Sequence, residues 1–205
     1  MAGTLVDVPT RIPQQERSRV TQRRLLEATV DCLVEHGWSG TTTTLIASTA
    51  GVSRGAQLHH YPTKTALVLA AVEHLALRRA EEIRAEAASL APGDTDRVVE
   101  LLAAAFTGPL HVAALEVWVA GRTDPALRAA LVPLEARVGR EIYRLAVDLL
   151  GADDLQPAVR EAVQATIDLL RGLGVANLLT DDALRRRAIL TAWTGHLRAI
   201  LGSTK

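Results

Sequence analysis

The sequence predicts an all-α fold, with three helices in an N-terminal domain and a larger helical domain after it. Ala, Leu and Arg are abundant while aromatic residues make up 3% of the chain, and this composition favours helix over strand. Apolar residues recur at steps of three and four along most of the 205 residues, and strand-like alternation is lacking. With 48% apolar and 22% charged residues, the chain can bury a packed core.

Capping residues and glycines divide the N-terminal part of the chain into short helices. After a polar, flexible tail at 1–15, the first helix ends at Gly37, because glycine favours the position just past a helix. A threonine run caps the second helix, which Gly51 ends, and Ser53 caps the third. Thr63 caps a long fourth helix. The helices expected here cover about 16–37, 42–50, 53–61 and 64–88.

The remainder of the chain keeps the helical period. Ala91, Pro92 and Gly93 form a turn signal and a soft boundary. Asp124 caps a later helix, and Pro133 lies inside it, so a kink or a helix boundary is expected there. The helices expected after the turn cover about 94–107, 110–120, 125–149, 156–179 and 181–201.

The net charge of zero hides a small asymmetry along the chain. Residues 1–64 contain seven Lys and Arg against five Asp and Glu, and no acidic residue lies between His36 and Val72. The N-terminal region is therefore electropositive. This charge permits a polyanionic partner without proving one.

Cys32 is the single cysteine, so no internal disulfide can form. Its place in an apolar helical pattern predicts a buried, inert thiol rather than a redox or nucleophilic group. The sequence has neither a signal-peptide segment nor an apolar run of about 20 residues. We therefore expect a cytoplasmic protein with no membrane association.

The stretch Gly51-Val52-Ser53-Arg54-Gly55 has two interpretations. It matches the G-x-S-x-G elbow that exposes a nucleophilic serine in α/β-hydrolases, but that elbow needs a buried strand before the serine. The preceding residues follow a helical pattern instead. A small residue at Ala47, a glycine at the turn and an apolar residue just after it are typical of a helix-turn-helix.

The segment TTTLIASTAGVSRGAQLHHYPTK, at 42–64, resembles the N-terminal DNA-binding domain of the TetR family of bacterial transcriptional repressors. An amphipathic helix precedes the segment and the apolar ALVLAAV follows it, so the match runs from Arg19 to about Leu67. The resemblance implies a helix-turn-helix DNA-binding domain at 16–63 and an effector-binding and dimerisation domain at 64–205.

The resemblance also implies roles for individual residues. The third helix would lie in the major groove, where Arg54 could donate two hydrogen bonds to a guanine. The family usually has leucine then tyrosine where this chain has Gln57 then Leu58, so the phosphate contact of that tyrosine is missing or is made by Gln57 or His59. Lys64 would meet phosphate with help from the helix dipole. The expected DNA-binding residues are Thr43, Thr44, Ser53, Arg54, Gly55, Ala56, Gln57, His59, His60 and Lys64.

The sequence indicates neither a metal nor a cofactor. His59 and His60 point about 100° apart on a helix, so they are poorly placed to chelate one ion. Asn177 replaces the last glycine of a dinucleotide fingerprint that would begin at Gly172. The arginines from 11 to 24 form either a solvated helix face or an arm for the minor groove.

The resemblance implies that the C-terminal part dimerises and senses a small molecule. Polar or aromatic residues among apolar neighbours on the middle helices are the effector candidates: Phe106, His111, Trp118, Arg122 and Tyr143. The last two helices are apolar on more than one side, which suits an intersubunit four-helix bundle or, alternatively, a core within one subunit. The dimer candidates are Val163, Ile167, Leu170, Ile189, Trp193 and Leu197.

The sequence thus predicts a homodimeric repressor that binds a palindromic double-stranded DNA operator and is released by a small-molecule effector of unknown identity. Two alternatives stay open. One is an all-helical small-molecule binding protein or enzyme with an incidental helix-turn-helix. The other is a repressor that has no effector and therefore no accessible pocket.

Overall fold

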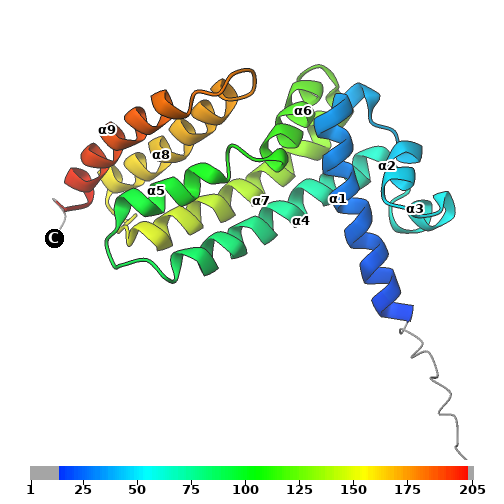
Figure 1. The fold of residues 1–205 in the computed structure, drawn as a ribbon, viewed down its shortest axis with the longest axis horizontal. Helices are drawn as coiled ribbons and strands as arrows, with labels where there is room; N and C mark the ends of the chain where they lie inside the picture. The colour runs from blue at the N-terminus through cyan, green and yellow to red at the C-terminus, as the bar shows by residue number, and fades with distance from the viewer. Residues whose placement is uncertain (1–13, 203–205) are drawn as a thin grey trace, which may run out of the picture.

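The computed structural model describes residues 14–202, and every regular element in that range is an α-helix (Figure 1). The expected all-α fold is confirmed. In chain order the helices of the described range are α1 Gln14–Gly40, α2 Thr43–Thr49, α3 Arg54–His60, α4 Lys64–Ala87, α5 Thr95–Ala104, α6 Pro109–Thr123, α7 Pro125–Leu150, α8 Pro157–Ala176 and α9 Ala183–Gly202.

The capping residues that the sequence predicts are the ones that start the helices. Each accepts a hydrogen bond from a backbone N–H in the first turn, which satisfies a donor that has no partner within the helix. Gly37, with φ 63° and ψ −177°, interrupts the regular geometry of α1 at the predicted end, and one further turn continues to Gly40. The expected side-chain caps are Thr42, Ser53, Thr63 and Asp124, and Asp94 caps α5 in the same way.

Two expectations need correction. Gln14 and Gln15, which we placed in the tail, belong to α1, while the rest of the expected tail, including Arg11, lies outside the described residues. The helix boundary considered at Pro133 is wrong, because α7 continues through this residue as one helix of 26 residues.

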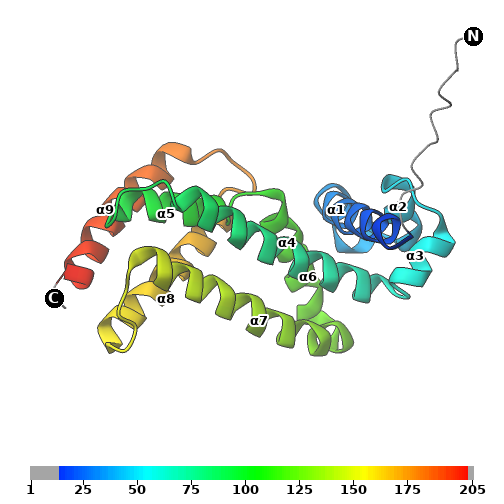
Figure 2. The same cartoon turned by 90° about the horizontal axis from the view of Figure 1, so that it is seen from below.

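The long helices α4 and α7 run along the molecule, with α2 and α3 at one end and α9 at the other (Figure 1 and Figure 2). Helix α1 crosses α4 and also packs on α6. Helices α5, α8 and α9 cover the end remote from α3. This arrangement places the helix-turn-helix far from the C-terminal helices.

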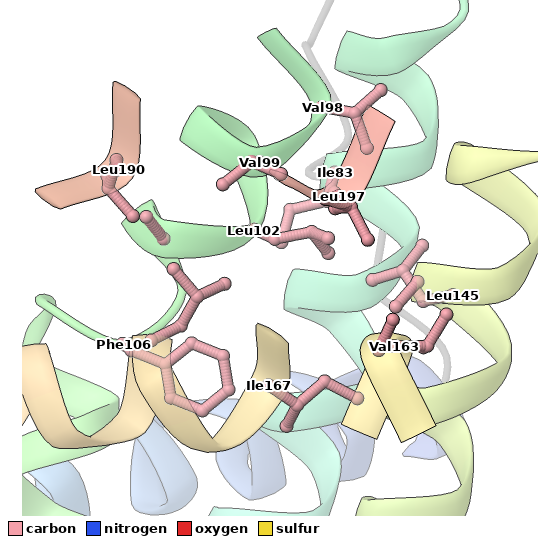
Figure 3. Packing of buried hydrophobic residues seen from close by; sticks show 14 of the residues in the cluster. Ile83, Val98, Val99, Leu102, Phe106, Leu145, Val163, Ile167, Leu190 and Leu197 are labelled. Carbon is pink, nitrogen blue, oxygen red and sulfur yellow. The ribbon is translucent and has the colours of Figure 1, made fainter. Parts of the chain in front are cut away.

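Three clusters of buried apolar side chains follow one another along the molecule. The first joins α1, α2 and the first turns of α4, where Leu67 and Ala71 contribute. The third lies among α4, α5, α7, α8 and α9 (Figure 3). The middle cluster joins the last turns of α1 to α4, α6 and α7, and therefore ties the N-terminal helices to the larger domain. It contains Val30, Leu33, Val68, Val72, Ala113, Val117, Leu127, Leu131 and Leu134.

Among residues 14–202, no single helix is long and apolar enough to cross a membrane. Helices α5 and α6 together reach the required length and composition, but they are bent by 58° relative to each other.

A glycine at position 174 allows α8 to approach the segment between α5 and α6. Gly174 is buried, and a Cβ on it would overlap the backbone oxygen of Phe106 and lie 2.8 Å from Nε2 of His111. Gly139, in the interior of α7, has no heavy atom within 4 Å of the corresponding position.

We expect Gly174→Ala to lower the free energy of unfolding by about 1–3 kcal/mol, because a backbone oxygen cannot move aside cheaply. We expect Gly139→Ala to raise it by up to about 1 kcal/mol, because alanine has the higher helix propensity. Urea denaturation of both variants measures the two effects. A change of the same sign in both would contradict the steric explanation.

Candidate nucleic-acid interface and internal cavity

Helices α2 and α3 are joined by a tight turn at 50–53. Gly51 has φ 64°, a left-handed conformation that glycine adopts without steric cost. The turn is closed by a hydrogen bond from the Val52 backbone N–H to the Ala47 carbonyl, at 3.0 Å. Ser53 Oγ then accepts a hydrogen bond from the Ala56 N–H at 3.2 Å, which fixes the start of α3. The nucleophile-elbow interpretation fails here, because the residues before Ser53 form the helix α2 and not a strand.

One side of α3 is open to solvent. Ser53, Arg54, Gly55 and His59 are exposed, while Ala56 and His60 are half-buried. On α2, Thr44 is exposed and Thr43 is half-buried. These residues therefore lie where a partner can reach them, and their contacts with DNA stay predictions.

Gln57 is the exception among the expected DNA-binding residues. Its side chain is fully buried, and its Nε2 donates a hydrogen bond to the Tyr61 carbonyl at 2.5 Å. Gln57 therefore stabilises the end of α3 from inside the domain and does not reach a phosphate in this structure. Leu58 is 46% exposed and carries no polar group, so His59 is the remaining candidate for the missing phosphate contact.

Lys64 lies at the start of α4 and is already engaged within the protein. Its Nζ donates a hydrogen bond to the Trp38 carbonyl and lies 3.9 Å from the centre of the Trp38 ring. Burial lowers the pKa of Lys64 from its usual value. Lys64 thus links α4 to the end of α1, and any phosphate contact must be made from this position.

A cavity of about 90 Å³ lies among α4, α5, α6, α7 and α8. Its lining is mostly apolar, and three of the five predicted effector residues, Phe106, His111 and Trp118, contribute to it. Besides Trp118, with its indole N–H, four residues with charged or titratable side chains line it: Arg79, His111, Glu135 and Arg171.

Arg122 and Tyr143 do not line this cavity, so their expected role in effector binding stays a prediction. Arg122 is exposed near the end of α6, one turn beyond Trp118, and borders surface grooves outside the cavity. Tyr143 does not line the cavity, although its neighbour Ile142 does, and burial, followed by the charge of Asp154, raises the pKa of its hydroxyl. Helical spacing alone did not distinguish the side of α7 that faces the cavity.

Glu135 and Arg171 were missed, because each looks like a surface charge in the sequence. Trp118 Nε1 donates a hydrogen bond to Glu135 Oε1 at 2.5 Å. The Arg171 guanidinium carbon lies 5.5 Å from the centre of the Trp118 ring and 6.0 Å from that of Phe106. Glu135 on α7 and Arg171 on α8 each lie next to an apolar stripe of their helix. This position is the only signal in the sequence that could have suggested that their side chains face inward.

Burial controls the charges around the cavity. It lowers the pKa of His111, and the nearby positive charge of Arg171 lowers it further, so the imidazole is neutral near pH 7. Burial raises the pKa of Glu135, although the Trp118 N–H and Arg171 partly oppose this effect. The cavity is therefore lined by two arginines, Arg79 and Arg171, one neutral imidazole and a carboxylate that protonates more readily than usual.

The expected dimer residues also require correction. Val163, Ile167, Leu170 and Leu197 are at most 3% exposed within one subunit and belong to its third core cluster, where Figure 3 shows Val163, Ile167 and Leu197 beside residues of α4, α5 and α7. The alternative that these faces fill the subunit's own core holds for these four. Ile189 and Trp193 are half-buried, and Trp193 Nε1 donates to Thr166 Oγ1 at 2.9 Å.

The sides of α8 and α9 that face away from the core carry residues other than the expected dimer residues. Small and apolar side chains recur there at steps of three and four, with Leu184 84% exposed. The exposed or half-buried members are Ala165, Leu169, Gly172, Ala176, Leu184, Ala188, Ala192 and Gly195.

The capped helix α3, set against α2 by a tight turn and open on one side, defines a helix-turn-helix DNA-binding protein. Residues 25–71 match the model of the family described as bacterial regulatory proteins, tetR family. The transcriptional regulator CymR of Pseudomonas putida is 40% identical over 181 residues, which are 86% of this chain and 89% of CymR. The chain belongs to the TetR family of transcriptional regulators.

Two solved structures share the fold. A transcriptional regulator from Pseudomonas aeruginosa PAO1 is 26% identical, with a TM-score of 0.65 and coverage of 92% of this chain and 93% of that one. A regulator from Saccharomonospora viridis, solved in complex with choline, is 21% identical, with a TM-score of 0.63 and coverage of 85% and 95%.

The Ser53 cap gives a direct test of the geometry of α3. We expect Ser53→Ala to lower the free energy of unfolding by about 1 kcal/mol, because the Ala56 N–H loses its acceptor, and to weaken DNA binding modestly. Ser53→Thr and Ser53→Asp should partly restore stability. Chemical denaturation measures the series. Loss of an esterase activity without loss of stability, or labelling of Ser53 by a fluorophosphonate, would contradict the capping role.

Proposed function

We propose that the protein is a homodimeric repressor that binds a palindromic operator and leaves it when a small molecule occupies the cavity. The observation that carries the proposal is the combination of an exposed, capped α3 at one end of α4 with a lined cavity farther along the same helix. In a dimer, two copies of α3 would enter successive major grooves about 34–36 Å apart.

The exposed residues on and near α3 would contact either bases or phosphates of the DNA. Arg54 is at the first position of α3 and can present its guanidinium to the two acceptors of a guanine. Gly55 carries no side chain, so the helix can approach base edges closely. Thr44 and His59 extend the same surface, and Lys64 faces the phosphates from the start of α4.

A dimer would use the outward sides of α8 and α9. Ala188, Ala192 and Gly195 on α9 are exposed and small, so a second pair of helices could pack closely against them. Leu184 would lose its large exposed surface in such a contact. The buried residues first expected at this interface pack instead in the subunit's own core, on the inner sides of α8 and α9.

Two helices, α4 and α6, connect the cavity to the DNA-binding domain. Helix α4 begins at Lys64 and lines the cavity from Val72 to Ile83. Helix α6 lines it with His111 and Trp118. Between those two positions, the Glu116 carboxylate accepts a hydrogen bond from the Trp38 backbone N–H at 3.2 Å.

A ligand that shifts α4 or α6 would therefore also move the end of α1. Two states then differ in the spacing of the two α3 helices, and an effector favours the state that does not fit the operator. This coupling supports release by an effector over a repressor that lacks one.

DNA binding with purified protein tests the function. We expect Arg54→Ala to weaken operator binding by about 1–3 kcal/mol and to relax the preference at one base pair per half-site. We expect Lys64→Ala to weaken all duplexes alike and to reduce the salt slope by about one per site, because it removes a phosphate contact. Fluorescence anisotropy on operator and random DNA, at several salt concentrations, measures both.

Arg97→Ala is the matched control, because Arg97 is an exposed arginine on α5, far from α3. Equal losses for Arg54→Ala on operator and random DNA would show that Arg54 does not read bases. Wild-type protein without salt-dependent duplex binding would favour a small-molecule binding protein instead.

The dimer surface is tested by charging its centre. We expect Ala192→Glu to yield a folded monomer, because Ala192 is exposed within one subunit but would be buried, as a carboxylate, between two. Ala136→Glu, on the exposed side of α7, is the control and should leave the dimer intact. Analytical ultracentrifugation with circular dichroism measures mass and folding. A monomeric wild type, or a dimeric Ala192→Glu variant, would contradict this interface.

A further inference from the structure

We infer that the cavity binds a small monocarboxylate with an apolar body, whose carboxylate is received by Arg171 and His111. The inference deepens the proposed function and rests on it for the regulatory consequence. The ligand chemistry itself rests on the lining of the cavity, its unpartnered polar atoms and its distribution of charge.

The size and lining of the cavity limit the body of the ligand. At about 90 Å³ the cavity is smaller than a roughly 150 Å³ apolar cavity that holds benzene in another protein. Its walls are mostly aliphatic and aromatic, with Ile83, Leu102, Phe106, Val138 and Leu145 among them. A single ring or a short alkyl chain is therefore the upper limit for the body of the ligand, and the walls must move outward to admit it.

Two buried polar atoms in this lining have no hydrogen-bond partner among the residues that the structure describes. They are Nε2 of His111, a residue 6% exposed, and Nε of Arg171. An arginine Nε always donates, and a neutral imidazole Nε2 donates in one of its two tautomers. Leaving such groups unpaired away from water is unfavourable, so an oxygen that accepts from both would complete the site.

The charges favour an anion over a cation. Arg171 already lies beside the rings of Trp118 and Phe106, the faces that would otherwise attract a cationic ligand. Asp168 accepts from only one guanidinium nitrogen of Arg171, Nη1 at 2.8 Å. Arg79, the other cation of the lining, is paired with Glu82 and Glu86 on its own helix.

Glu135 is the acidic group of the lining and would repel a carboxylate. Its hydrogen bond from Trp118 Nε1 holds it on the cavity wall. Burial already raises the pKa of Glu135, so this group can take up a proton when an anion enters. Any proton that Glu135 takes up reduces its repulsion of the carboxylate and leaves Arg171 as the charge that faces the ligand.

Isothermal titration calorimetry with matched ligands tests the inference. Benzoate and hexanoate are compared with benzyl alcohol, 1-hexanol and benzylamine, each titrated into the full-length wild-type protein. We expect each carboxylate to bind about tenfold more tightly than the alcohol of the same body, because its hydrogen bonds to Arg171 and His111 are charge-assisted. Arg171→Met should remove this preference, because methionine keeps the apolar reach and lacks the donor.

Arg97→Met is the matched control, because Arg97 is an exposed arginine on α5 outside the cavity, and it should leave the preference unchanged. Circular dichroism checks folding, and Arg171→Gln replaces Arg171→Met if the latter does not fold. Equal or tighter binding of the alcohols or the amine, or no binding of either carboxylate, would overturn the ligand class.

Operator release is measured separately, by anisotropy at saturating carboxylate. Binding with the expected preference but without loss of operator affinity would overturn the effector role and leave the ligand class standing. Loss of operator affinity in the wild type, but not in Arg171→Met, would support both.

Discussion

The contact between the end of α1 and the middle of α6 determines where the DNA-binding helices lie. Gly37 permits it in two ways: its φ of 63° turns the chain, and a Cβ on it would lie 2.9 Å from Glu116 Oε2. The Glu116 carboxylate on α6 accepts a hydrogen bond from the Trp38 backbone N–H, and Lys64 Nζ on α4 donates one to the Trp38 carbonyl. Two of the helices that line the cavity, α4 and α6, therefore bind the same residue at the end of α1.

The local structure was predictable from the sequence because its causes are local. Thr42, Ser53 and Thr63 cap helices through their own side chains, and Gly51 has a positive φ that few other residues adopt. The apolar period then fixes which stretches are helical. Along α3 the resemblance to the TetR family, not the apolar period, led us to expect Arg54 and His59 to face a partner, and both side chains are exposed in the structure.

The tertiary assignments were less accurate, because a periodic pattern reveals an apolar face but not what covers it. Helix α8 has a stripe containing Val163 and Ile167 that could equally meet a second subunit or α5 and α7, and it meets the latter. Gln57 looked like a groove residue, yet it is the fourth residue of α3 and turns toward the core. Arg171 looked like a solvated charge, although its guanidinium lies beside the ring of Phe106, between α5 and α6, and that of Trp118 on α6.

The strength of an effector response depends on how much more weakly the operator-binding state binds the ligand than the other state does. Moving a two-state equilibrium from 99:1 to 1:99 requires a difference in binding free energy of about 5.5 kcal/mol between the states. Burial of a small apolar body contributes about 2 kcal/mol, and a charge-assisted hydrogen bond about 1.5–3 kcal/mol. The body and one such hydrogen bond together give about 3.5–5 kcal/mol, so a full switch also needs the bond from the second donor to differ between the states. Since Arg171 is on α8 and His111 on α6, a displacement of α6 relative to α8 would separate the two donors. The same displacement would carry Glu116 and the end of α1 with it, which joins ligand recognition to the position of α3.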